Sequence, residues 1–123
     1  MAYEINWEPR GVVKRFFGIV KAGEVLAAVV RVEADERFDS LRYVINDLSS
    51  VDGFEITHGE VEEVAAIDKA ASLTNPGIRI AVVATLPEIV MAARAYATSK
   101  FNVFPTRIFA TQFEARRWLS GST

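Results

Sequence analysis

The 123-residue sequence contains no cysteine and a single histidine, His58. The lack of cysteine excludes disulfide bonds, thiolate nucleophiles and cysteine-ligated metal sites. With one histidine, most nucleophile–base pairs cannot be assembled. The chain also lacks a glycine-rich phosphate loop and a Gly-x-Ser-x-Gly elbow, and no His/Asp/Glu cluster has metal-ligand spacing. We therefore expect no catalytic residues, no metal, no cofactor and no enzymatic activity.

Two further classes are excluded by charge and by the length of the apolar runs. The net charge of -2 argues against nucleic-acid binding, which needs a basic surface. The longest apolar-rich stretch, residues 89–97, is interrupted by Arg94, whereas a membrane span needs roughly 20 apolar residues. The first residues do not have the basic segment and apolar run of a secretory signal. We expect a cytoplasmic protein without nucleic-acid partners.

Charge is unevenly distributed along the chain. Residues 1–76 contain 8 Lys/Arg and 14 Asp/Glu, a net charge of -6, whereas residues 77–123 contain 6 and 2, a net charge of +4. One interpretation is that the two halves neutralise each other on folding. The other is a basic face that meets an anionic partner or a membrane.

Half of the residues are apolar, enough for the core of one domain over residues 1–123. Strands and helices are predicted in the order ββαβαβαβα, which indicates an α/β fold with a mixed five-stranded sheet and four helices. The predicted strands cover residues 3–7, 12–20, 43–48, 78–84 and 106–110. The predicted helices cover residues 23–33, 57–75, 87–100 and 112–120. Residues 49–56 and 101–105 are predicted loops.

Three of the predicted helices begin with the same local pattern, a Thr followed three residues later by a Glu. This spacing is typical of a capping box, in which the Thr hydroxyl accepts from a first-turn amide and the Glu reaches back. The predicted boxes are Thr57/Glu60, Thr85/Glu88 and Thr111/Glu114.

Asp68 lies on the apolar face of the predicted helix 57–75, at helical spacing from Val61, Val64, Ala65 and Ala71. Burying an isolated carboxylate is costly, so this side chain must be paired or hydrogen-bonded. Two interpretations stay open: a satisfied structural aspartate, or a polar group that lines a pocket.

An aromatic loop follows Tyr96 and lies between the cations Lys100 and Arg107. Its apolar residues are Phe101, Val103 and Phe104. They either close the core over the last strand or form an exposed apolar lip for a homodimer or a membrane surface. Because successive side chains of an extended segment point to opposite sides, at least one of the three is expected to face solvent.

A resemblance to known proteins covers nearly the whole chain. The order of elements and the run Asp47-Leu48-Ser49-Ser50-Val51 resemble a STAS domain, the fold of anti-sigma-factor antagonists. Residues 35–49 and 66–84 resemble the bacterial SpoIIAA-like family, which is grouped with the STAS and CRAL-TRIO lipid-transfer domains. The resemblance implies a SpoIIAA-like fold.

The resemblance also implies a non-enzymatic module with a cavity for an apolar or lipid-like small molecule. The candidate ligand-binding residues are Asp68, from the apolar face of its helix, and Tyr96, Phe101 and Phe104, from the aromatic segment. Homodimerisation and peripheral membrane contact are further expectations. The alternative is a regulatory domain that binds a partner protein, as the antagonists do.

In the antagonists, the second serine of an Asp-Ser-Ser-Gly loop is phosphorylated. The matching stretch here is Glu55-Ile56-Thr57-His58, so Thr57 alone could be the acceptor. Ile replaces the first serine and His replaces the glycine, so the turn that the kinase recognises is expected to be absent. Thr57 is therefore either a plain helix cap or a regulatory phospho-acceptor.

Overall fold

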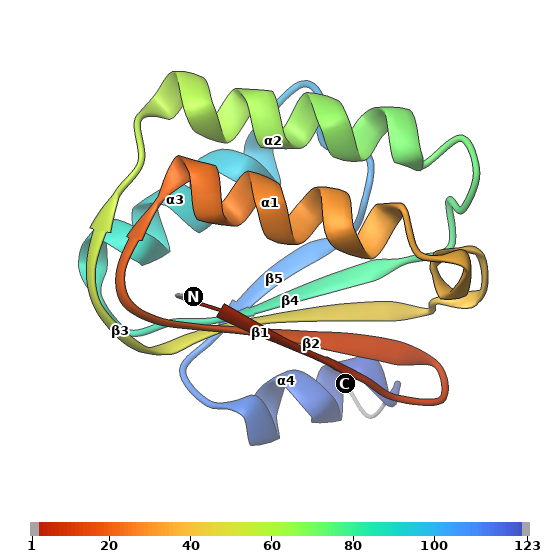
Figure 1. Cartoon of the computed structure of the whole chain (residues 1–123). Helices are drawn as coiled ribbons and strands as arrows, with labels where there is room; N and C mark the ends of the chain where they lie inside the picture. Colours follow the sequence, from red (N-terminus) through yellow and green to blue (C-terminus); the bar gives the residue numbers. More distant parts are fainter. Residues whose placement is uncertain (1–2, 122–123) are drawn as a thin grey trace.

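Five strands form one mixed sheet in the order β1-β2-β3-β4-β5 (Figure 1). β1 is antiparallel to β2, and all other neighbours are parallel. The β1–β2 turn ends at Gly11, where a Cβ would overlap the Tyr43 ring. The strands are β1 (Tyr3–Trp7), β2 (Gly11–Lys21), β3 (Tyr43–Glu55), β4 (Arg79–Val83) and β5 (Thr106–Phe109).

The helices divide unequally between the two faces of the sheet, as Figure 1 shows. One face carries α1 (Ala22–Glu33), α2 (His58–Ala71) and α3 (Pro87–Thr98), and the other carries α4 (Gln112–Leu119). A short 3-10 helix, η1 (Glu36–Ser40), follows α1. The predicted order ββαβαβαβα and the mixed five-stranded sheet are therefore confirmed. This computed structural model describes residues 3–121, so the predicted domain, residues 1–123, extends past the described residues at both ends.

The core is split by the sheet into two apolar clusters. The larger lies between the sheet and the three helices, and the smaller lies under α4 around Ile45, Ala115 and Trp118. β4 supplies both, because Ile80 and Val82 belong to the larger cluster and Ala81 and Val83 to the smaller. This agrees with the continuous apolar sequence of a parallel strand covered on both faces.

The predicted loop over residues 49–56 is wrong, because β3 continues to Glu55. The end of β2 provides the partner: Phe17 is in register with Ser50, and Lys21 with Glu55. Two register shifts let β3 accommodate extra residues as bulges, and Gly18 takes a φ of 73° beside the second. Pairing with a long β2 therefore overrides the turn-forming residues of this segment.

The predicted helix 57–75 is too long, since α2 ends at Ala71. Asn75 is buried and donates through Nδ2 to the carbonyls of Phe38 and Leu41, at 2.8 and 2.9 Å. The side chain thus ties the segment after α2 to the chain before β3. α3 also ends two residues earlier than predicted, at Thr98.

The three predicted capping boxes differ in outcome. The Thr57 box is complete: its hydroxyl accepts from the Glu60 amide at 3.2 Å, and its own amide donates to the Glu60 carboxylate at 2.8 Å. At α4 the Thr111 hydroxyl accepts from the Glu114 amide at 3.2 Å. The Thr85 box is wrong, because Leu86 is the N-cap and Pro87 takes the first helical position.

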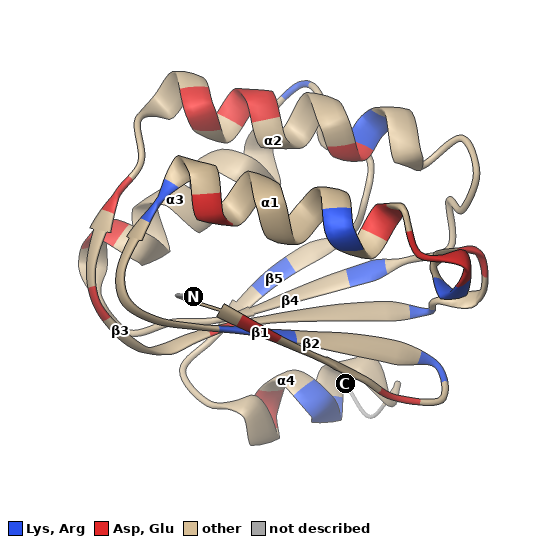
Figure 2. Ribbon diagram, viewed as in Figure 1, with Lys and Arg blue, Asp and Glu red and all other residues tan. Residues whose placement is uncertain are grey.

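The uneven charge of the sequence is also visible in space. Figure 2 shows acidic residues on η1, α1 and α2, whereas basic residues mark β4 and β5. One ion pair joins the two halves of the chain, between Arg116 and Glu8 at 2.7 Å. Other ion pairs of the described residues, such as Arg15–Glu4 at 3.4 Å, form within the acidic half.

Candidate functional site

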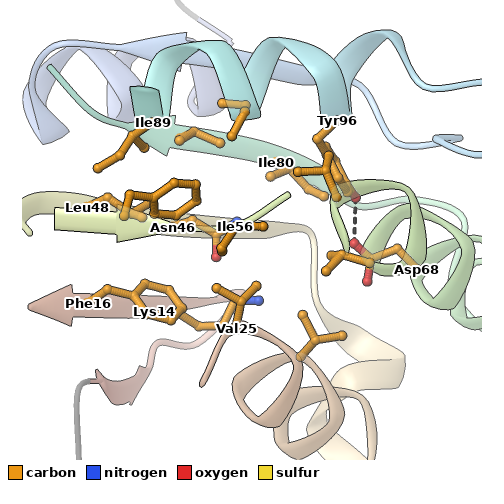
Figure 3. A pocket seen from close by; sticks show the side chains of 17 residues that line it. Lys14, Phe16, Val25, Asn46, Leu48, Ile56, Asp68, Ile80, Ile89 and Tyr96 are labelled. Atoms are coloured by element: carbon orange, nitrogen blue, oxygen red, sulfur yellow. Dashed lines mark hydrogen bonds between the residues drawn. The ribbon is translucent and has the colours of Figure 1, made fainter. Parts of the chain in front are cut away.

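The main cavity lies between the sheet and the three-helix face and has a volume of about 110 Å³. Seventeen side chains line it: sixteen come from β2, β3, β4 and the three helices, and Ile56 comes from the link between β3 and α2. Figure 3 shows that Phe16, Leu48 and Ile89 lie toward one end, and Asp68 and Tyr96 toward the other. The cavity therefore has an apolar end and a polar end.

The floor of the polar end comes from two neighbouring strands. Along β2, Val12, Lys14 and Phe16 alternate onto the face that the three helices cover. Lys14 is in register with Asn46 of β3, and both line the cavity. The fold thus places an amine and an amide side by side on an otherwise apolar face.

The opposite wall carries the predicted residues Asp68 and Tyr96. Asp68 of α2 accepts a hydrogen bond from the Tyr96 hydroxyl of α3 at 2.5 Å, the dashed line of Figure 3. Burial raises the pKa of Tyr96, and the neighbouring charge of Asp68 raises it further. Both interpretations of Asp68 therefore apply, since it is hydrogen-bonded and it also lines the cavity.

Glu33, the last residue of α1, completes this polar group. Burial and a hydrogen bond with Asp68 raise the pKa of Glu33 to about 9, so its carboxyl is protonated at neutral pH. In that form it can donate to the Asp68 carboxylate, as the Tyr96 hydroxyl does. Asp68 is thereby supplied with donors from both sides.

The side chains of Lys14 and Asn46 both line the cavity without a hydrogen-bond partner among residues 3–121. Lys14 is 7% exposed, no residue of that range forms a close ion pair with it, and its Nζ atom is not fully enclosed by protein. Burial lowers the pKa of Lys14, while the charge of Asp68, and that of Glu33 when it is ionised, oppose this shift. An acceptor atom of a bound molecule would satisfy the amine.

The other two predicted ligand-binding residues lie elsewhere. Phe104 is buried in the larger core and borders a second cavity of about 30 Å³, which it shares with Lys14, Glu33 and Asp68. Phe101 lines an open surface hollow beside His58, away from the main cavity. Asp68 and Tyr96 therefore share one site, Phe104 lines only the neighbouring second cavity, and Phe101 lines neither.

The aromatic loop exposes one of its three apolar side chains. Val103 is 48% exposed, Phe104 is buried and Phe101 is half-buried. Asn102 holds the loop, because Nδ2 donates to the Phe104 carbonyl at 3.0 Å and Oδ1 accepts from the Phe104 amide at 3.1 Å. The prediction that one side chain faces solvent is confirmed at Val103, and a lip that includes Phe104 is not formed.

Thr57 and His58 lie exposed at the start of α2. The Thr57 hydroxyl donates to the Glu60 carboxylate at 3.0 Å, and His58 Nε2 lies 3.6 Å from a Glu62 carboxylate oxygen. A phosphate on Thr57 would meet the Glu60 carboxylate and break the capping box. The role of Thr57 as a regulatory phospho-acceptor stays a prediction.

Lys14, Asn46 and Glu33 line the cavities but were not predicted as site residues from the sequence. A signal was present in β2, where the alternation Val12, Lys14, Phe16 places a lysine on the buried face. The same alternation places Asn46 between Val44 and Leu48 in β3. Glu33 had no comparable signal, because a charged residue at the end of a helix is ordinarily exposed.

Two searches within residues 3–121 gave negative results. No group of three or more His, Asp or Glu side chains there is placed to hold a metal ion. No helix there is long and apolar enough to cross a bilayer.

Comparison with known proteins places the fold. No family model matches the chain. No curated protein matches it either. Among solved structures, the chain is similar to the anti-sigma factor antagonist SpoIIAA in its unphosphorylated form, with 15% identity, a TM-score of 0.64, and 98% of this chain and 99% of that chain covered. SpoIIAA of Bacillus in its phosphorylated form gives 14% identity, a TM-score of 0.63 and coverage of 96% and 99%.

A third structure extends this likeness. An uncharacterised DUF3478-family protein with a SpoIIAA-like fold, from Shewanella loihica, gives 15% identity, a TM-score of 0.56, and coverage of 96% of this chain and 92% of that chain. The fold implied by the sequence is therefore confirmed: the chain has a SpoIIAA-like fold.

Proposed function

We propose that this chain is a non-enzymatic regulatory domain that works by binding a partner protein, as an anti-sigma factor antagonist does. The observation that carries the proposal is the end-to-end likeness to SpoIIAA, which covers 98% of this chain and 99% of that one.

The tip of the β2–β3 ladder and the start of α2 are the surface that we assign to the partner. Ile19 is 57% exposed and is in register with Gly53 of β3, four residues before Thr57. An exposed isoleucine beside an exposed polar helix start offers both apolar contact and hydrogen bonding to a partner.

The test is affinity purification of the tagged protein from its own cells, with partners quantified by mass spectrometry. Ile19→Glu and Thr57→Glu should each lower the yield of a partner by about ten-fold or more, a loss of roughly 1.4 kcal/mol in binding. Leu73→Glu and Met91→Glu, at positions 88% and 70% exposed elsewhere, are the matched controls. Equal partner yields for all four variants would contradict the proposed surface.

A second function is favoured by the cavity itself. We propose that it holds a small apolar molecule, because most of its lining is apolar and an engineered cavity of roughly 150 Å³ is known to bind benzene. With about 110 Å³, this cavity is suited to a molecule of that order of size. Bound molecules of this kind stabilise a protein by mass action.

Thermal unfolding in increasing toluene tests this second function. The melting temperature should rise with toluene for the wild type and should rise less for Ala92→Leu, which fills part of the cavity wall. Native mass spectrometry of the purified protein would reveal a co-purified lipid. An unchanged melting temperature and no bound molecule would overturn the proposal.

Peripheral membrane contact and homodimerisation stay predictions. They rest on Phe101 and Val103 beside Lys100, whose Nζ lies 5.2 Å from the centre of the Phe101 ring. Sedimentation with anionic and with neutral vesicles tests the first, and sedimentation equilibrium the second, with Val103→Ser as the variant. Binding to neither vesicle type and a monomer at all concentrations would remove both roles.

A further inference from the structure

Lys14 is the polar group that the cavity leaves unexplained. Lys14 is 7% exposed, and its side chain lines both cavities. Asn46, Asp68 and Tyr96 line the main cavity with it. Of these, Asp68 and Tyr96 satisfy each other. No residue of the range 3–121 offers the Lys14 amine an acceptor, which leaves the amine available to a ligand that enters the cavity.

The charges around Lys14 determine which polar group of a ligand can bind beside it. Asp68 already carries a negative charge at the polar end, and Glu33 faces Lys14 from the second cavity. A carboxylate ligand would place a second negative charge beside Asp68 in an apolar cavity, which is costly. A neutral oxygen acceptor such as a carbonyl avoids that cost and satisfies the amine.

We propose that the cavity captures a small apolar aldehyde or ketone as an imine on Lys14 Nζ. This proposal rests on the apolar-ligand function proposed above. The amine lone pair attacks the carbonyl carbon, and one amine proton passes to the oxygen, giving a carbinolamine. Glu33, protonated, gives its proton to the hydroxyl as the C–O bond breaks. Water leaves, an iminium forms, and the Glu33 carboxylate balances its charge.

The environment of Lys14 favours this step over simple hydrogen bonding. The nucleophile in imine formation is the neutral amine, and burial in apolar surroundings favours that form. The apolar lining of the cavity also holds an apolar carbonyl compound beside this amine. The exposed lysines, Lys21, Lys69 and Lys100, share neither property and serve as internal references.

The probe is benzaldehyde with sodium cyanoborohydride at neutral pH, followed by intact mass and peptide mapping of the full chain. Lys14 should gain one benzyl group at least about ten times faster than the exposed lysines, because burial lowers the pKa of its amine and leaves more of it neutral at that pH. Excess toluene should slow labelling of Lys14 and leave the others unchanged. 4-Carboxybenzaldehyde should label the exposed lysines and label Lys14 at least about ten times more slowly than benzaldehyde does.

Lys14→Met should lose the fast label and stay folded, and Tyr96→Phe should keep it. If toluene raises the melting temperature but Lys14 is labelled no faster than the exposed lysines, the imine proposal fails and the apolar-ligand function stands. If toluene neither stabilises the protein nor competes with labelling, the apolar-ligand function fails as well. Fast labelling of Lys14 that toluene does not slow would overturn capture within the cavity.

Discussion

The two faces of the sheet treat their buried polar groups differently. On the α4 face, Asp47 is 6% exposed and its two carboxylate oxygens accept from Ser49 Oγ at 2.6 Å and from Gln112 Nε2 at 2.9 Å. On the three-helix face, Lys14 is buried to a similar extent, and its amine has no hydrogen-bond partner among residues 3–121. The α4 face therefore supplies partners for its own buried polar groups, whereas the three-helix face leaves one that a bound molecule could satisfy.

Other polar groups on the α4 face follow the same rule as Asp47. The Arg79 guanidinium donates to the Trp118 carbonyl at 3.0 Å and lies 4.7 Å from the centre of the Trp118 ring. Arg116 donates to both carboxylate oxygens of Glu8, which also accepts from the Tyr43 hydroxyl. These contacts lower the pKa of Glu8, chiefly through the Arg116 hydrogen bonds. This face therefore serves stability.

The largest expected effect is the loss of that stabilising packing. Trp118→Ala should lower the free energy of unfolding by about 3–5 kcal/mol, because it leaves a cavity under α4. Trp118 is 8% exposed, whereas Phe113 on the same helix is 69% exposed and is the matched control. Urea unfolding measures both variants. A small loss for Trp118→Ala, equal to that for Phe113→Ala, would remove the contrast between the faces.

Asp68 tests the partnered part of the three-helix face. Asp68→Leu should cost about 1–3 kcal/mol, since the Tyr96 hydroxyl loses its acceptor in a buried place. Asp68→Asn keeps an acceptor oxygen and should cost less. Chemical unfolding of the two variants at one pH decides the order. If Asp68→Leu were neutral or stabilising, the Asp68 carboxylate would not be a required acceptor for the Tyr96 hydroxyl.

Lys14 should respond in the opposite direction. Lys14→Met should raise the free energy of unfolding by about 1 kcal/mol, because it replaces a buried amine without a partner by an apolar side chain of similar length. Lys69→Met, at an exposed position of α2, should change nothing. The comparison uses unfolding curves at neutral pH. Destabilisation by Lys14→Met would mean that the amine holds the fold together.

The smallest effects concern the helix caps. Thr57→Ala and Thr111→Ala should each cost about 1 kcal/mol, because each hydroxyl accepts from a first-turn amide. Thr85→Ala should be close to neutral, since Thr85 lies outside its helix. Melting temperatures of the three variants separate these cases. If Thr85→Ala lowered the melting temperature as much as Thr57→Ala does, Thr85 would be a helix cap after all.

The fold was largely predictable from the sequence, because alternation, helical spacing and the breaks at proline and glycine are local. The end of β3 was not, since its pairing with β2 depends on a contact between distant segments. Asp68 was recognised from its place on an apolar stripe. Its partner Tyr96 was noted only as a neighbour of the aromatic loop, because two residues 28 positions apart in the sequence are brought together by the fold alone.

The central claim is that the Lys14 amine faces an open cavity without a partner. The most direct measurement is a pH titration of the four lysines by NMR of their labelled ε-carbons, assigned with Lys14→Met and repeated with toluene. The Lys14 signal should titrate at a lower pH than those of Lys21, Lys69 and Lys100, and toluene should shift it alone. A Lys14 signal that titrates with the other three and does not respond to toluene would contradict the claim.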